Sequence, residues 1–256
     1  MTYRIEAAAG CNKGRIRSNN EDNLFFAGKT LEQENEGLRR AVGQRFSTDS
    51  EVCFCVFDGM GGEESGEVAS YTAARAMKEI FEESRDYLSS PKKTLERICM
   101  RMNEAVCNTA ESLEYVRMGS TMVSLLFVMD EVYMCNIGDS RAFRLRDNEW
   151  LQLSQDHTER LPANMDEKKH KPRLTQHLGI SPDELTLEPY IAKGDLRRGD
   201  QYLLCSDGLT DMLTNVEICA LIKEERNTKK CVERLINLAL EHGGRDNVTA
   251  ILCRVK

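Results

Sequence analysis

The sequence lacks several features that mark common classes of protein. It contains no Cys-x-x-Cys pair, which argues against a zinc ribbon. No apolar run approaches the roughly 20 residues that span a bilayer, and the first 22 residues hold no apolar core of signal-peptide length. Positive charge is not in excess, because 35 Lys and Arg face 42 Asp and Glu, a net charge of −7. A general nucleic-acid binder usually presents a basic face. We therefore expect a cytoplasmic protein that binds neither membrane nor nucleic acid.

Ten cysteines are present, but their spacing does not indicate a disulfide framework. Cys53 and Cys55 lie two positions apart in a strand-like run and therefore point to the same face. Four others fall within helical patterns: Cys99, Cys107, Cys219 and Cys231. This distribution predicts buried free thiols in a reducing compartment.

The length of 256 residues suits one large domain or two small ones, and there are no internal repeats or low-complexity linkers. Apolar periodicity predicts helices at 65–84, 91–113, 215–225 and 228–242. It predicts strands at 3–9, 22–27, 50–57, 120–129, 131–137, 141–146, 150–153, 185–191, 200–205 and 247–254. The polar segments 29–49 and 155–178 are interpreted as loops, the second as a lid. Clustered strands and paired helices indicate an α+β protein, with two mainly antiparallel sheets packed together and helices outside.

Acidic residues recur where strands begin or end. They stand beside Gly, Ser or Asn at five junctions: Glu21 and Asp22, Asp58, Asp139, Asp207 and Asp246. A single Asp-Gly is commonly only a turn. Asp58 and Asp207, however, each follow an apolar strand and precede helical sequence, which is not a hairpin pattern. Strand ends can converge on one edge of a layered fold, where gathered carboxylates would repel one another unless hard cations held them.

Oxygen-only ligands without His or Cys suit Mg²⁺ or Mn²⁺ better than Zn²⁺. Gly59 has no side chain, so its carbonyl could approach the same cation. Arg17 lies four residues before Glu21, and a guanidinium fork beside a carboxylate–metal cluster suits a phosphate dianion. Taken alone, Arg17 also fits a surface arginine that bonds to a loop.

Seven short motifs now carry a family resemblance. In order they are RSNNED, VFDGMGGEESGE, GST, IGDSR, SQDH, CSDGLTD and GGRDNVT. This series, spread over about residues 5–255, resembles the metal-dependent protein phosphatases of type 2C, in particular their bacterial branch. The resemblance implies a single catalytic domain over residues 1–256, built as a four-layer α-β-β-α sandwich with its metal centre at one edge of the sheets. It also implies hydrolysis of phosphoserine and phosphothreonine in proteins.

The resemblance implies a role for each matching residue. Asp58 would bridge two Mn²⁺ or Mg²⁺ ions, with the Gly59 carbonyl on one of them. Asp207 and Asp246 would ligate the first ion, Glu21 the second, and Asp22 would hold metal-bound water. Asp139 with Asp207 would bind a third ion, as in bacterial relatives. Arg17 would grip the substrate phosphate, and Asn247 would support the loop around Asp246.

The implied mechanism needs no covalent intermediate, because two cations about 3.5–4 Å apart can share a bridging water and activate it for attack on phosphorus. The implied partners are phosphorylated proteins, including a serine/threonine kinase and its substrates, and the implied state is a monomer. Two positions depart from parts of the family. Met60 stands where eukaryotic members often carry His. Glu63 stands where many bacterial members carry His. The source of a proton for the leaving group is therefore open.

Other interpretations remain to be weighed. A dinucleotide-binding loop at Gly59 would need Gly at position 64, where Glu64 stands. A metal hydrolase acting on small phosphoesters would share the site chemistry. A catalytically weak relative could bind phosphoproteins as a regulatory module, although every expected acid is present. His157 is expected to order its loop with Asp156, and His170 and His177 are expected to be exposed.

Overall fold

The structure, a computed structural model, describes residues 1–61, 65–83, 90–114, 118–160 and 172–256. Its strands are β1 (Arg4–Asn12), β2 (Asp22–Phe25), β3 (Val42–Ser47), β4 (Val52–Gly61), β5 (Met118–Ser120), β6 (Met122–Val128), β7 (Glu131–Ile137), β8 (Arg141–Arg146), β9 (Glu149–Gln152), β10 (Tyr190–Asp195), β11 (Gln201–Cys205) and β12 (Val248–Val255). Its helices are α1 (Gly66–Glu83), α2 (Pro91–Ser112), α3 (Asp207–Thr210), α4 (Asn215–Glu224) and α5 (Thr228–Glu241).

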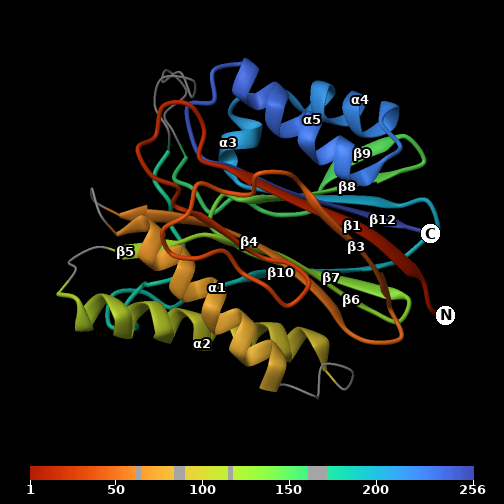
Figure 1. Cartoon of the computed structure of the whole chain (residues 1–256). Coiled ribbons are helices and arrows are strands. Elements are labelled where there is room, and N and C mark those ends of the chain that lie inside the picture. The colour runs from red at the N-terminus through yellow and green to blue at the C-terminus, as the bar shows by residue number, and fades with distance from the viewer. Residues whose placement is uncertain (62–64, 84–89, 115–117, 161–171) are drawn as a thin grey trace.

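The strands form two antiparallel sheets that pack face to face between helices (Figure 1). The first sheet has the order β3-β1-β12-β11-β8-β9, and α3, α4 and α5 cover its outer face. The second has the order β10-β7-β6-β4-β2, with α1 and α2 on its outer face and β5 paired to β4. This is the four-layer α-β-β-α arrangement that the resemblance implied, so the predicted fold class is confirmed.

Three apolar cores fill the spaces between the layers, because both faces of the central strands are apolar. On β4, Phe54 and Val56 point into the core between the sheets, whereas Cys55 and Phe57 point toward α1 and α2. The alternation along residues 50–57 predicted two covered faces, and the prediction is confirmed. All ten cysteines are free, and eight of them are buried.

Helix ends follow the expected chemistry in most cases. Thr214 accepts a hydrogen bond from Glu217 N and is the N-cap of α4 in a capping box. Gly243 and Gly244 follow α5 with φ angles of 125° and 51°, in the region of positive φ that favours glycine. Ser90 is the N-cap of α2 by position, but its side chain makes no capping hydrogen bond.

Several predicted boundaries are wrong. Residues 29–49 were expected to be a loop, yet β3 lies there as an exposed edge strand paired with β1. The strand through Asp58 does not end at that residue but continues to Gly61, opposite β5. The single strand expected at 120–129 is two strands, β5 and β6, and the strand expected at 185–191 begins at Tyr190. The expected lid falls partly on 161–171, outside the described residues.

No described helix combines the length and the apolar character that crossing a membrane would require.

Candidate metal centre

Two carboxylates predicted as ligands lie side by side on neighbouring strands. Asp22, the first residue of β2, pairs directly with Asp58 of β4 in the antiparallel register. Directly opposed residues have their Cβ atoms about 4.5–5.5 Å apart. Glu21 precedes the pair, and its main-chain oxygen accepts a hydrogen bond from Gly59 N at 3.0 Å. The edge of the second sheet therefore gathers three of the predicted acidic residues.

Asp22 is buried between the two sheets. Its Oδ2 accepts hydrogen bonds from Ser206 Oγ at 2.8 Å and from Thr249 Oγ1 at 2.7 Å, both in the first sheet or at its end. Its Oδ1 is also buried, and no group among the described residues hydrogen-bonds to it. Burial, and to a smaller extent the charges of Asp246 and Glu21, raise the pKa of Asp22 to about 7 against the pull of those two hydroxyls.

Arg17 lies among these carboxylates. Its Nη2 donates to Asp246 Oδ2 at 2.7 Å, and the side chain is half exposed. Burial works to lower the pKa of Arg17, but the negative charges of Asp246, Glu21 and Asp58 outweigh it, so the pKa rises. The guanidinium of Arg17 thus experiences the charges of three predicted metal ligands, and its role in binding phosphate stays a prediction.

Asn247 connects the segments that carry these groups. Its Oδ1 accepts from Glu21 N at 2.8 Å, and its Nδ2 donates to Lys13 O at 2.7 Å and Asn19 O at 2.9 Å. Its own main-chain N donates to Asp246 Oδ1 at 2.9 Å. The buried amide therefore positions Glu21 while the main-chain N holds the Asp246 carboxylate, which fits the supporting role expected for Asn247.

Asp207 reaches the site from the end of β11, as the first residue of the short helix α3. It follows Ser206, the residue that donates to Asp22. A Cβ added to Gly208 would lie 1.9 Å from Asn247 O, so the chain after Asp207 packs tightly on the loop of Asp246 and Asn247. The first sheet thus presents Asp207 and Asp246 from neighbouring strands, β11 and β12.

Asp139 is buried in the turn between β7 and β8. The next residue, Ser140, hydrogen-bonds through its Oγ to Thr121 Oγ1 at 2.7 Å, and Thr121 accepts from Asp58 N at 3.1 Å. His157 donates from its main-chain N to Gly138 O at 3.0 Å, and Asp156 pairs with Arg141 at 2.6 Å. His157 and Asp156 order this turn, as expected, and two hydroxyl groups join the turn to Asp58.

Two glycines allow the chain to close around Glu21. A Cβ on Gly59 would lie 1.9 Å from Gly66 O and 2.7 Å from Glu21 O. A Cβ on Gly66 would lie 2.7 Å from Glu21 Cδ. Packing alone therefore demands glycine at Gly59, whatever its carbonyl binds. Glu63 lies outside the described residues, and His177 is half-buried rather than exposed, because its ring packs against Gly119.

The donor chemistry of the site fits a hard divalent cation. Every predicted ligand offers oxygen, and the buried Asp22 Oδ1 is a polar atom that a cation or its water could satisfy. In the described residues, however, no three His, Cys, Asp or Glu side chains are arranged as a complete metal site. The Arg17 guanidinium lies on Asp246 instead. The individual ligand assignments therefore stay predictions.

Sequence reasoning missed Ser206, Thr249 and Thr121, whose hydroxyls hold the carboxylates and their backbone in place. Each lies inside one of the quoted motifs, CSDGLTD, GGRDNVT and GST. The recurrence of a Ser or Thr within these motifs was the available signal that hydroxyl groups support the acidic residues.

A comparison with protein families decides what this arrangement is. The sequence model described as "Protein phosphatase 2C" matches residues 41–253. The chain belongs to the protein phosphatase 2C family. The resemblance stated from the seven motifs is thereby confirmed.

Individual relatives of this 2C family member agree with that assignment. The serine/threonine phosphatase stp of Listeria innocua serovar 6a is 29% identical over 252 residues, which cover 94% of this chain and 92% of that protein. The crystal structure of the catalytic domain of the serine/threonine protein phosphatase PstP, in complex with two manganese ions, matches with a TM-score of 0.78 at 28% identity and covers 100% of this chain and 99% of that one. The structure of the S. agalactiae serine/threonine phosphatase matches with a TM-score of 0.82 at 26% identity and covers 98% of this chain and 100% of that one.

Proposed function

We propose that this chain hydrolyses phosphoserine and phosphothreonine in proteins with two Mn²⁺ or Mg²⁺ ions as cofactors. Membership of the protein phosphatase 2C family makes it a metal-dependent phosphoprotein phosphatase. The observation that supports this function best is the meeting of Glu21, Asp58 and Asp246 around Arg17, although Asp58 and Asp246 lie far from Arg17 in the sequence. The PstP catalytic domain, which was crystallised with two manganese ions, has the same fold.

The predicted ligands have different roles in holding the metal ions. Bound cations would lower the pKa of a water molecule and polarise the phosphoryl oxygens. We propose that Asp58, Glu21, Asp207 and Asp246 hold these ions, with Gly59 contributing its carbonyl and Asp22 a second layer of hydrogen bonds. Asp139 would add a site for a third ion with Asp207.

Arg17 would bind the phosphate of the substrate and stabilise charge on its oxygens during transfer. Its half-exposed side chain can reach a ligand that enters from solvent, and the same side chain lies within the field of the carboxylates. Asn247 acts through its neighbours, because its amide fixes the main chain of Glu21 and its main-chain N holds the carboxylate of Asp246. No covalent phosphoenzyme is required.

The experiment is phosphate release from a phosphothreonine peptide with Mn²⁺, with Mg²⁺ and with EDTA. We expect turnover with either metal and none in EDTA, and Asp58→Asn and Asp246→Asn should lose turnover and bind Mn²⁺ more weakly by calorimetry. Asp183→Asn, an exposed acid remote from the site in sequence, is the matched control and should behave as wild type. Undiminished activity in EDTA, or full activity of Asp58→Asn, would contradict the proposed chemistry.

Two other functions make different predictions in the same assay. A regulatory module would bind the phosphopeptide without releasing phosphate. A hydrolase of small phosphoesters would turn over p-nitrophenyl phosphate but leave the phosphopeptide intact. We further propose that the enzyme acts in the cytoplasm as a monomer and opposes a serine/threonine kinase, on the kinase itself and on its substrates.

A further inference from the structure

A strongly basic hollow lies at the end of the sandwich opposite the candidate metal centre. β12 leaves the centre at Val248 and ends at Val255, beside two adjoining cavities of about 370 and 440 Å³. Both chain termini lie at this end of the sheets (Figure 1). The cavities share Arg198 and Lys256, so they form one groove. We call it the basic groove, and its cations are Arg4, Arg198, Lys223, Arg226, Arg254 and Lys256.

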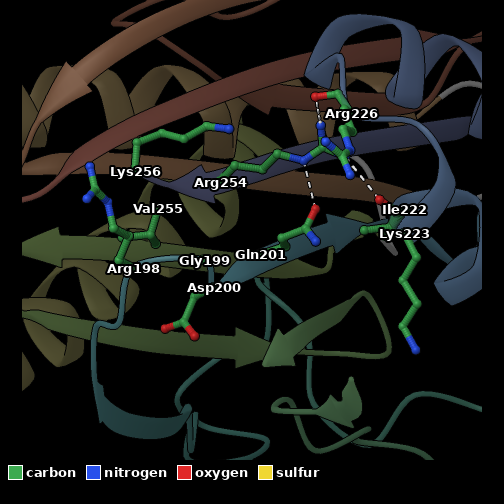
Figure 2. A pocket seen from close by; sticks show the side chains of 10 residues that line it. All are labelled: Arg198, Gly199, Asp200, Gln201, Ile222, Lys223, Arg226, Arg254, Val255 and Lys256. Atoms are coloured by element: carbon green, nitrogen blue, oxygen red, sulfur yellow. Dashed lines mark hydrogen bonds between the residues drawn. The ribbon is translucent and has the colours of Figure 1, made fainter. Parts of the chain in front are cut away.

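The acid that lines the groove does not neutralise it. Asp200 is buried, and its carboxylate points away from Arg254 (Figure 2). Both oxygens of Asp200 are held by Arg146, through Nε at 2.7 Å and through Nη2 at 2.6 Å. Asp200 therefore compensates Arg146 rather than the cations of the basic groove.

Acids near the groove are also engaged elsewhere. Glu224 and Glu225 lie 3.1 and 3.9 Å from Arg234 Nη1, and Glu6 accepts from Thr228 Oγ1 at 2.5 Å. None of the six groove cations forms an ion pair with a carboxylate of a described residue. In a chain with a net charge of −7, these cations form a local concentration of positive charge that no such ion pair neutralises.

Arg254 forms the floor of the groove and is only 5% exposed. Its guanidinium donates to Gln201 Oε1 at 2.7 Å, to Ile222 O at 3.1 Å and to Arg226 O (Figure 2). These acceptors are an amide and main-chain carbonyls, which satisfy its N–H groups but carry no net charge. The charges of Glu6 and Glu225 act on Arg254 from nearby, but burial outweighs them and lowers its pKa, so an anion above Arg254 would be stabilised.

The form of the groove favours an extended anion over a compact one. It runs from Arg4 on β1 to Lys223 on α4, and five of its six cations are exposed along the way. Tyr3 is its one aromatic residue among those described, whereas single-stranded nucleic acid is usually held by several stacking aromatics.

We propose that the basic groove binds an acidic segment of phosphoprotein substrates and so raises their concentration at the metal centre. This inference rests on the proposed phosphatase function. β12 spans roughly 23 Å between the two sites, at about 3.3 Å per strand residue. An extended linker of at least about seven residues is needed to cover that distance, and more to pass around the surface.

The test compares two phosphothreonine peptides with the same phosphosite. One carries a run of Glu and Asp after a flexible Gly/Ser linker of about 12 residues, and the other carries Ser and Gly in place of the acids. We expect the acidic peptide to show a KM lower on the order of tenfold at low salt, with kcat unchanged. The variant Lys223→Ala/Arg226→Ala should remove this advantage, since both side chains are exposed and neither is paired with a carboxylate.

The matched control is Lys93→Ala/Arg97→Ala, which removes the same two charges from the exposed face of α2. It should keep the full advantage of the acidic peptide. Equal KM values for the two peptides in wild type, or an advantage that survives in Lys223→Ala/Arg226→Ala, would overturn the proposal. So would tighter binding of an oligo-dT strand than of the acidic segment.

Turnover of p-nitrophenyl phosphate tests the phosphatase function separately from the binding of an acidic segment by the basic groove. We expect it to be the same in wild type and in both double variants, because the groove lies away from the reacting groups. Binding of a fluorescent acidic peptide without phosphate, followed by anisotropy, reports on the groove alone. Retained anisotropy binding with no hydrolysis of any substrate would overturn the phosphatase function and support the groove as an acidic-segment site.

Discussion

Arg17 Nη2 and Asp246 Oδ2 lie 2.7 Å apart, although 229 positions separate the residues in sequence. The contact joins the residue expected to bind phosphate to a residue expected to bind metal. A cation on Asp246 and the guanidinium of Arg17 would repel each other, so both cannot use the same carboxylate oxygen without cost. We therefore expect metal binding at Asp246 to release Arg17 for substrate.

This coupling gives Arg17→Ala two opposite effects. Loss of the guanidinium should raise KM for a phosphopeptide about tenfold or more, because a charge-assisted contact to phosphate is removed. The same change should leave Mn²⁺ affinity equal or higher, because a competing positive charge is gone. Arg15→Ala, an exposed neighbour, is the control for both measurements. Weaker Mn²⁺ binding by Arg17→Ala in calorimetry would contradict the coupling.

Asp22 should make the metal-free protein less stable as the pH rises. Its pKa is about 7 in the folded chain, against an ordinary value of 3.8. Between these values the folded chain keeps a proton that the unfolded chain has released, so the free energy of unfolding falls as pH rises from about 4 to 7. Each unit of pKa difference corresponds to about 1.4 kcal/mol.

The measurement is the melting temperature in EDTA at pH 5 and pH 7.5. We expect a larger fall for wild type than for Asp22→Asn, whose amide can still accept from Ser206 and Thr249 and does not ionise. Adding Mn²⁺ at pH 7.5 should raise the melting temperature of wild type, because a bound ion stabilises the folded state. The same pH dependence in both proteins would show that Asp22 is not the responsible group.

The arrangement of layers could be predicted because it follows from apolar patterns. β4 alternates two apolar faces, and α5 ends at paired glycines, so both were located within a few residues. β3 could not be found this way. Five of its six residues are exposed, so it has no buried face to create a period, and only backbone pairing with β1 makes it a strand.

The acids of the site could be predicted because they recur at strand junctions, but their supports could not. Asp58 to Gly61 has little intrinsic strand preference, and pairing with β2 and β5 imposes the extended conformation. That Asp22 would be held by hydroxyls from the other sheet depends on how the two sheets pack. Sequence spacing carries no information on that packing.

Asn247→Ala should weaken both the fold and the site. The side chain makes three hydrogen bonds to the main chain of Glu21, Lys13 and Asn19, and Asn247 is 3% exposed. Each such bond contributes about 1 kcal/mol, so we expect the free energy of unfolding to fall by roughly 2–4 kcal/mol. Urea denaturation measures this, and Asn108→Ala on the exposed face of α2 should change it little. An unchanged Mn²⁺ affinity would show that Asn247 supports the fold only.

Gly59→Ala should disrupt the site by collision. The new Cβ would lie 1.9 Å from Gly66 O, a main-chain atom that cannot move without shifting α1. We expect a loss of several kcal/mol in stability, in the range found for severe steric strain, and loss of turnover. Gly194→Ala on the edge strand β10 is the control, since its Cβ would meet no atom closer than 3.9 Å. Wild-type stability of the Gly59→Ala protein would show that α1 can move away from β4 without loss of stability.

Arg146→Ala should destabilise the protein far more than removal of an exposed arginine. Arg146 and Asp200 form a bidentate pair at 2.6 and 2.7 Å, and their side chains are 12% and 1% exposed. Loss of the arginine leaves a buried carboxylate without its cation, which costs about 3–5 kcal/mol. Arg234→Ala breaks a pair with Glu224 that is 44% and 70% exposed, so we expect a loss below about 1 kcal/mol. Chemical denaturation of both variants in EDTA measures the difference without a contribution from metal. Similar losses in the two variants would show that water reaches Asp200 and replaces the arginine.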